Sequence, residues 1–224
     1  MGYRALATDV DGTLTRKGRG ISLEAIQAIR DLEKHGIPVI LASARPFPVL
    51  NILREYIGCS GAVICENGGH VEYRGEARIL GDRADGLKAY RRLRESIGGS
   101  VVEAWTNKYN IVDVALNRTI PRPEVQRVVG TFPSLKLLDS GFFYHIMPAD
   151  VEKGRGLKAA VELMGMEAGD VVAIGDSEVD VDLLRAAGFG VAVSDSSEDL
   201  KVVADLVTEG PDGEGFCEAM RRLF

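Results

Sequence analysis

Short apolar runs alternate with amphipathic segments over the first third of the chain. Strand-length apolar runs fall at residues 5–8, 38–42 and 62–65. Between them, apolar residues recur at helical spacing over 22–36, where Ser22 can cap a helix and Gly36 can end it, and over 47–57, which Gly58 closes. Strands and helices at this spacing predict parallel strands joined by right-handed crossovers.

The middle third of the chain follows a different pattern. Short apolar runs at 71–73 and 78–80 flank Arg74-Gly75 and predict a small hairpin. A basic amphipathic helix is expected over 84–97. Beyond it we expect strands at 101–104, 111–116, 136–138 and 142–147 and a helix at 123–129. This order is typical of an antiparallel α+β unit.

The last third returns to the pattern of the first. We expect helices at 156–164 and 179–187, strands at 171–174 and 191–193, and two closing helices. The chain would enter the middle unit near Gly81 and leave it near Pro148. We therefore predict an α/β protein. Its Rossmann-like parallel-sheet core is built from residues 1–81 and 150–224, and an α+β cap domain is inserted at 82–149.

Composition excludes several classes of protein. The chain is 46% hydrophobic and 27% charged, which argues against a disordered chain. Its apolar stretches are strand-length, far shorter than the roughly 20 residues that a bilayer requires. The formal net charge of −6 argues against nucleic-acid and membrane-surface partners. The oligomeric state is left open, with a homodimer among the alternatives.

The cysteines bear on the compartment. Cys59, Cys65 and Cys217 are irregularly spaced and fit neither a disulfide framework nor a zinc site. They fit a reducing environment, as buried small apolar residues. The N-terminal segment lacks the basic and apolar regions of a secretion signal, so we expect a cytoplasmic location.

Two carboxylates follow the first predicted strand. Asp9 and Asp11 stand two residues apart in Asp9-Val10-Asp11-Gly12-Thr13. The carboxyl ends of parallel strands carry the site in such sheets, and two close acids require a cation or a proton between them. The alternative is an Asx turn that caps a helix.

A second acidic pair follows a later strand. Asp176 and Asp180 stand in Gly175-Asp176-Ser177-Glu178-Val179-Asp180. Acids at a helix start also favour the helix dipole, and we assign Asp182 to that role. Together with Asp9 and Asp11, the pair would form an oxygen-rich site for Mg²⁺.

Three further residues can bind an anion. Ser43 ends the second strand, and its hydroxyl can bond a phosphate oxygen to which Arg45 adds positive charge. Lys153 precedes a helix where the chain re-enters the core. Each is weak alone, since strand-end serines usually cap helices and most lysines are solvated.

These motifs in this order resemble the haloacid dehalogenase superfamily of aspartate-nucleophile phosphohydrolases. The resemblance rests on Asp-x-Asp-Gly-Thr, the strand-end Ser43, Lys153-Gly154 and Gly-Asp-x-x-x-Asp. The position of the insertion resembles the type that carries an α/β cap. The short chain and Glu66-Asn67-Gly68-Gly69 are similar to the archaeal phosphoglycolate phosphatase branch.

The resemblance implies a role for each residue. Asp9 would be the nucleophile and a Mg²⁺ ligand, and Asp11 the general acid and base, with its backbone carbonyl on the metal. Ser43 and Lys153 would hold the phosphoryl group. Asp176 and Asp180 would complete the metal site. Many relatives have Asn immediately before the second acid, where this chain has Val179, so a contact made through that Asn is absent.

The implied activity is Mg²⁺-dependent hydrolysis of a small phosphomonoester, with 2-phosphoglycolate favoured. A sugar-phosphate phosphatase and a phosphomutase are alternatives within the same chemistry. A phospho-acceptor signalling domain belongs to another class, but it would carry its phosphoacceptor on a different strand from its acidic pair. A binding protein with a decayed site is a further alternative, which the complete set of acids disfavours.

Overall fold

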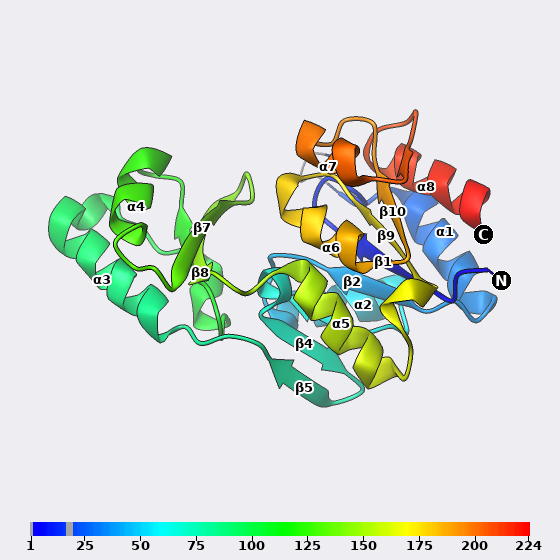
Figure 1. Cartoon of the computed structure of the whole chain (residues 1–224), viewed down its shortest axis with the longest axis horizontal. Helices are drawn as coiled ribbons and strands as arrows, with labels where there is room; N and C mark the ends of the chain where they lie inside the picture. The colour runs from blue at the N-terminus through cyan, green and yellow to red at the C-terminus, as the bar shows by residue number, and fades with distance from the viewer. Residues whose placement is uncertain (1, 17–19) are drawn as a thin grey trace.

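A single sheet organises the larger of two lobes in this computed structural model, which describes residues 2–16 and 20–224 (Figure 1). Residues 1 and 17–19 of the predicted core lie outside the described part. The sheet contains β1 (Ala5–Asp9), β2 (Val39–Ala42), β3 (Val63–Cys65), β4 (His70–Tyr73), β5 (Glu76–Ile79), β9 (Val171–Gly175), β10 (Phe189–Ala192) and β11 (Leu206–Val207). Their order is β11-β10-β9-β1-β2-β3-β4-β5, with parallel pairing from β11 to β3 and antiparallel pairing beyond.

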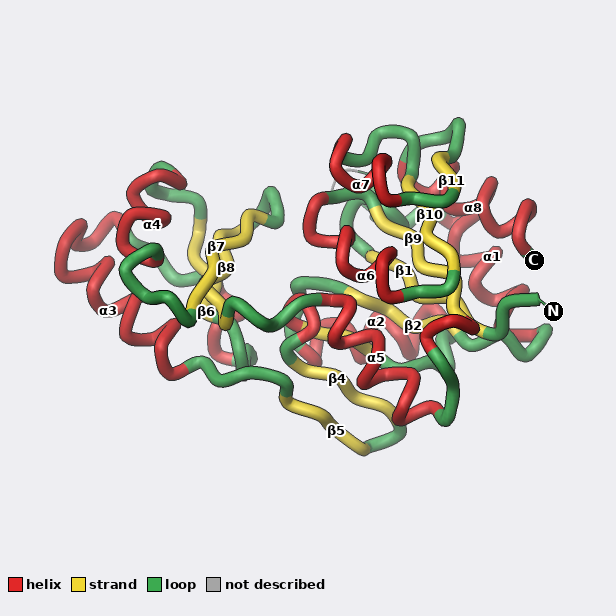
Figure 2. The backbone as a smooth tube through the Cα atoms, in the orientation of Figure 1, coloured by secondary structure: helices red, strands yellow, loops and turns green. Residues whose placement is uncertain are grey.

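Helices cover both faces of this sheet (Figure 2). One face packs against α1 (Leu23–Lys34), α2 (Phe47–Ile57) and α8 (Asp212–Leu223). The other packs against α5 (Lys153–Met164), α6 (Val181–Ala186) and α7 (Glu198–Val203). Because both faces are covered, β1 is buried along its whole length, as expected of a parallel sheet.

Local signals in the sequence set several helix ends. The Ser22 hydroxyl accepts a hydrogen bond from the Ala25 amide at 3.2 Å and caps α1. Gly58 ends α2 with a φ of 96°, a left-handed conformation that favours glycine. Short 3-10 turns connect other elements: η1 (Glu66–Gly68), η2 (Gly98–Ser100), η3 (Trp105–Lys108), η4 (Ala168–Asp170) and η5 (Glu178–Asp180).

The smaller lobe has its own sheet and core. Strands β6 (Val114–Asn117), β8 (Phe143–Pro148) and β7 (Leu135–Asp139) pair antiparallel in that order. Helices α3 (Ala84–Ile97) and α4 (Arg122–Val129) pack on this sheet through a separate apolar cluster. The chain termini both lie on the larger lobe, far from the smaller one (Figure 1). The predicted α/β core with an inserted α+β unit is confirmed, and the exact domain boundaries stay a prediction.

One expected strand in the insertion is wrong, and another begins three residues later than expected. Residues 101–104 form no named strand and touch β6 through the isolated bridge Glu103–Leu116. The strand expected at 111–116 begins only at Val114. Residues 111–113 form a turn whose amide groups bond the Glu66 carboxylate, so they are not available to a sheet. The apolar Val112, which suggested a strand, is instead buried beside Met147 and Val151.

Three smaller differences concern the returning core. Helix α5 begins at Lys153, one turn earlier than expected. The helix expected at 179–187 is divided into η5 and α6, and β11 adds a short strand that the pattern did not predict. Among the described residues, no helix has both the length and the apolar character needed to cross a bilayer.

Candidate active site

The acidic and hydroxyl residues named from the sequence gather at one edge of the core sheet. Strand β1 pairs with β2 on one side and β9 on the other, so the carboxyl ends of all three lie together. Asp9 is the last residue of β1, Ser43 follows β2 and Asp176 follows β9. Ligands bind at such an edge, where the chain order of the strands reverses.

The buried Lys153 ammonium pairs with two carboxylates of the site, those of Asp9 and Asp180. It donates to Asp9 Oδ1 at 2.6 Å and to Asp180 Oδ1 at 2.6 Å, and the Lys153 side chain is only 1% exposed. The other oxygen of Asp180 accepts the backbone amides of Asp176 at 3.2 Å and Ser177 at 3.1 Å. The position of Lys153 in the first turn of α5 therefore aims a buried cation at the end of β1.

The cluster holds more negative than positive charge. Asp9, Asp176 and Asp180 place carboxylate oxygens within 4.8 Å of one another, around one ammonium. Burial raises the pKa of Asp9 well above its usual range, although the Lys153 charge opposes this shift. Burial and the Asp180 charge raise the pKa of Asp176 to about 7. Burial disfavours the Lys153 charge, but Asp180 and Asp9 outweigh it, and the pKa of Lys153 is raised.

The geometry fits a cation beside Asp9. Asp9 Oδ2 is buried and finds no hydrogen-bond partner among the described residues. Gly12 has a φ of 102°, and a Cβ there would collide with the Asp176 carboxylate. A Cβ on Gly175 would lie 2.6 Å from that of Asp180. Glycine at both positions lets the carboxylates approach closely, and their oxygen donors suit a hard divalent ion.

Asp11 lies beside the cluster and faces a different partner. The Arg45 guanidinium donates to Asp11 Oδ1 at 2.6 Å and to Oδ2 at 2.8 Å. The Ser43 hydroxyl is 3.4 Å from the same carboxylate. All the predicted site residues except Asp180 line one cavity. Asp180 instead accepts hydrogen bonds from the Lys153 ammonium and the Asp176 amide. The Asp11 side chain is not part of the carboxylate cluster.

The smaller lobe forms the opposite wall of this cavity. The cavity has a volume of about 460 Å³, a size that suits a small metabolite. Trp105 and the β7–β8 turn (139–143) line it from the smaller lobe. His145 also lines it, and its Nδ1 lies 2.5 Å from the buried Asp113 carboxylate while its Nε2 lies 3.0 Å from Ser140 Oγ. This chain of hydrogen bonds orients the turn that faces the acidic cluster.

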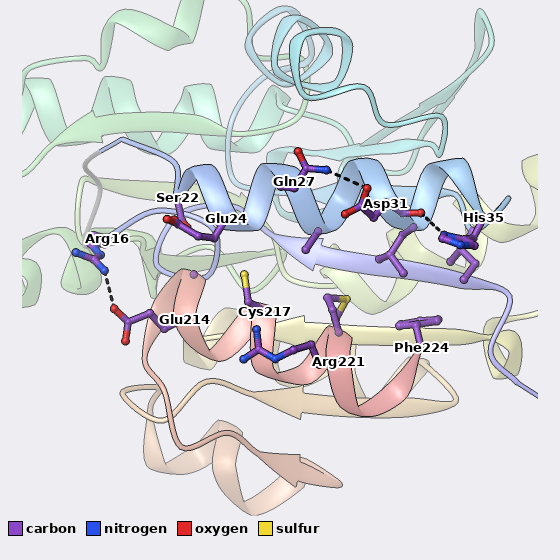
Figure 3. A pocket seen from close by; sticks show the side chains of 15 residues that line it. Arg16, Ser22, Glu24, Gln27, Asp31, His35, Glu214, Cys217, Arg221 and Phe224 are labelled. Atoms are coloured by element: carbon purple, nitrogen blue, oxygen red, sulfur yellow. Dashed lines mark hydrogen bonds and ion pairs between the residues drawn. The ribbon is translucent and has the colours of Figure 1, made fainter.

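A wider groove on the core is distinct from this site. It has a volume of about 980 Å³ and runs between α1 and α8 (Figure 3). Two of its charged side chains, Arg16 and Glu214, already pair with each other at 2.6 Å, and Asp31 pairs with Lys34 at 2.9 Å. It contains none of the strand-end carboxylates, so the chemistry is not expected there.

Several cavity residues had no individual role in the sequence analysis. Asn67 entered only through the short Glu-Asn-Gly-Gly motif, yet the residue lines the cavity. Ser140 and His145 lie on an ordinary-looking hairpin, and only the fold brings them opposite Asp9. A Gly-containing turn between two strands was the sole signal in the sequence, and it predicts a hairpin without a site.

The comparisons with known proteins agree with this geometry. A family model described as haloacid dehalogenase-like hydrolase matches residues 6–84 and 126–220. The chain belongs to the haloacid dehalogenase-like hydrolase family.

Similar proteins narrow the class. A phosphoglycolate phosphatase of Archaeoglobus fulgidus is 42% identical over 98% of this chain and 96% of that protein. Its counterpart in Methanothermobacter thermautotrophicus is 39% identical over 98% of both. A crystal structure from Thermoplasma acidophilum has a TM-score of 0.90 at 25% identity, covering 100% of this chain and 99% of that one. A haloacid dehalogenase-like hydrolase from Bacteroides thetaiotaomicron shares the fold, with a TM-score of 0.83 at 20% identity over 99% and 100% of the chains.

Proposed function

We propose that the protein is a Mg²⁺-dependent phosphatase that hydrolyses a small phosphomonoester, with 2-phosphoglycolate as the first candidate. The observation that carries the proposal is the buried Lys153 ammonium 2.6 Å from the carboxylate of Asp9, whose second oxygen has no partner among the described residues. One oxygen of Asp9 is thus held in place while the other is free to react. The names of the archaeal relatives support the choice of substrate.

Mg²⁺ fits the residues at this site. Asp9, Asp176 and Asp180 offer carboxylate oxygens in one cluster, and the Lys153 ammonium alone does not balance their three charges. Burial and the neighbouring carboxylates raise the pKa of Asp9 and of Asp176, which is consistent with a place for a cation. The backbone carbonyl of Asp11 would add a further oxygen. Once bound, a divalent cation would neutralise negative charge on the transferring phosphoryl group.

Asp9 would act as the nucleophile. A bond forms between its free oxygen and phosphorus, and the bond from phosphorus to the leaving oxygen breaks. Asp11 gives its proton to that leaving alkoxide. Water then attacks the aspartyl phosphate, Asp11 takes a proton from the water, and the bond between Asp9 and phosphorus breaks. Lys153 and Ser43 would hold the phosphoryl oxygens throughout, because both lie beside Asp9 at the sheet edge.

Arg45 connects this chemistry to an acidic substrate. The guanidinium pairs with both oxygens of Asp11, the residue that would donate the proton in the first step. A substrate that brings its own carboxylate would compete for Arg45 and release Asp11. The Arg45 side chain is 37% exposed at the cavity, so it can reach a bound ligand. This observation favours a phosphorylated hydroxy acid such as 2-phosphoglycolate over a sugar phosphate, whose organic part carries no carboxylate.

Two further predictions stay proposals. The thiols of Cys59, Cys65 and Cys217 are free and buried, which supports a reducing cytoplasm. A homodimer is one alternative for the oligomeric state, and light scattering at several protein concentrations tests it.

A phosphate-release screen tests the proposed function. Phosphate release from 2-phosphoglycolate, sugar phosphates and p-nitrophenyl phosphate is measured with Mg²⁺ and with a chelator. We expect metal-dependent release and the highest kcat/KM for 2-phosphoglycolate. Asp9→Asn should abolish turnover, whereas Asp182→Asn, a matched change on α6, should leave it intact. Full activity of Asp9→Asn would overturn the assignment, and isomerisation of a sugar phosphate without phosphate release would indicate a phosphomutase.

A further inference from the structure

Asn67 carries a carboxamide without a partner in the described part of the chain, at the edge of the active-site cavity. The residue lines the same cavity as Asp9, Ser43 and Lys153. The residue is 2% exposed, and neither its Oδ1 nor its Nδ2 has a hydrogen-bond partner among the described residues. Buried amide groups are almost always bonded, because an unpaired one loses its bonds to water without compensation. A ligand in the cavity would supply the missing partners.

The backbone at Asn67 is held in an unfavourable conformation. Its φ is 53°, and Glu66 before it has a φ of 50°. Left-handed conformations of residues other than glycine cost free energy and persist only where the surroundings impose them. Asn tolerates this region better than most residues, but Glu66 does not share that tolerance. The turn is therefore imposed by its surroundings, and it places Asn67 among the residues that line the cavity.

Two sets of hydrogen bonds impose the turn. The Glu66 and Asn67 amides donate to the carbonyls of Arg45 and Ser43, both at 3.1 Å. On the other side, the Glu66 carboxylate accepts the amides of residues 111–113 of the smaller lobe at 2.8–3.0 Å. Asn67 is thus fixed to the loop that carries Ser43 and, through Glu66, to the opposite lobe. Such anchoring gives a ligand-binding group a rigid position.

We propose that Asn67 is a substrate-binding residue whose carboxamide donates to an anionic oxygen of the bound phosphomonoester. The inference rests on the proposed function for the identity of the ligand. A neutral donor suits this place, since Arg45 and Lys153 already pair with carboxylates. The amide hydrogens add attraction for an anion without a further charge that would compete for Asp9 or Asp11. The oxygen could belong to the phosphoryl group or to an organic acid group.

Asn67→Gly tests this role while it relieves the backbone. Glycine adopts a positive φ freely, so the variant removes the carboxamide and the strain together. Arg74→Gly is a matched control, because Arg74 has a φ of 51° in the exposed β4–β5 turn away from the cavity. Both variants should keep or raise Tm. Only Asn67→Gly should lower kcat/KM, by about 10–100-fold, as expected when a hydrogen bond to a charged group is lost. Asn67→Asp keeps the shape of the side chain but gives it a negative charge, so its kcat/KM should fall further than that of Asn67→Gly.

Binding measurements separate this inference from the proposed function. Calorimetric titration with inorganic phosphate and with glycolate, in Mg²⁺, requires no turnover. Weaker phosphate binding by Asn67→Gly places the contact at the phosphoryl group, and weaker glycolate binding alone places it at the organic part. Wild-type affinities for both, with wild-type kcat/KM, would overturn the role of Asn67. A wild-type protein that binds phosphate but cleaves no ester would refute the proposed function and leave the Asn67 comparison informative.

Discussion

Replacing Lys153 with methionine tests the charge balance of the site. The ammonium lies 2.6 Å from Asp9 Oδ1 and 2.6 Å from Asp180 Oδ1, in a side chain that is 1% exposed. Methionine is similar in length and unbranched, so the variant removes the charge with little change in shape. The two carboxylates then stay buried without their cation. Removing one partner of a buried ion pair destabilises a protein by about 3–5 kcal/mol.

The stability lost in Lys153→Met should depend on pH. For a chain of this length, 3–5 kcal/mol corresponds to a Tm decrease of about 10 °C. The pKa of Lys153 is raised, so its stabilising charge is fully present below the unfolded pKa near ~10.4 and is constant between about pH 5 and 8. Burial raises the pKa of Asp9, and the variant loses the charge that lowers it. A buried acid whose pKa is raised in the folded state lowers the stability of the protein as pH rises. The stability lost in Lys153→Met is therefore largest at pH 8 and shrinks towards pH 5.

Scanning calorimetry in a chelating buffer at both pH values measures this deficit. Lys158→Met is the matched control, because Lys158 lies on the exposed side of the same helix. Its Tm should change by no more than about 2 °C, as is usual for a surface substitution. Equal deficits for the two variants, or a Lys153→Met deficit that does not vary with pH, would refute the charge-balance argument.

Three further predictions concern the acids and the cation. In Asp11→Asn, p-nitrophenyl phosphate should give a burst near one equivalent of p-nitrophenol while 2-phosphoglycolate, whose leaving group needs the proton, loses about 10²–10⁴-fold in its first step; equal first-step losses would exclude Asp11 as the acid. Because the pKa of Asp176 is about 7, Mg²⁺ affinity measured by calorimetry should rise up to about tenfold per pH unit below neutrality and level off above it; a flat profile would contradict this. Gly12→Ala should abolish Mg²⁺ binding, because its Cβ would collide with the Asp176 carboxylate. The control Gly36→Ala, at a position with a φ of 77° and open space around it, should lower the stability of the protein only. Intact Mg²⁺ binding in Gly12→Ala would show that the site can adjust.

The core could be predicted from the sequence because its signals are local. Helix α2 covers the predicted residues 47–57, since its apolar face, its end at Gly58 and the proline in its first turn all act within the helix itself. The carboxyl ends of β1, β2 and β9 were expected to meet because parallel strands leave no other arrangement. Asp9, Ser43 and Asp176 follow directly from that rule.

The insertion was harder to predict because long-range contacts decide its conformation. Residues 111–116 read as one strand, yet 111–113 bend to donate their amides to Glu66, a residue of the other lobe. No pattern within the segment reports that contact. The Asp113–His145 hydrogen bond likewise joins residues 32 positions apart. Ser140 and His145, which line the cavity from the smaller lobe, therefore had no signal of their own in the sequence.

The pairing of Asp11 with Arg45 was also outside the reach of motif reasoning. The motif assigns Asp11 to proton transfer and Arg45 to the substrate, but it does not say that each is the other's partner before substrate arrives. The structure shows that bidentate pair. A guanidinium bound in this way occupies both oxygens of Asp11, so the pair must open before Asp11 can serve the leaving oxygen.

The charges around the site indicate how a substrate could release Asp11 from Arg45. The carboxylates of Asp9, Asp176 and Asp180 would be balanced by the Lys153 ammonium and one divalent cation. A phosphomonoester dianion then enters a neutral cluster, and its own charge must be met by other donors. Arg45 is the cation at the cavity that pairs with a single carboxylate among the described residues, so it is the group that can turn to the substrate. Binding would thereby free both oxygens of Asp11 for the proton transfer to the leaving oxygen.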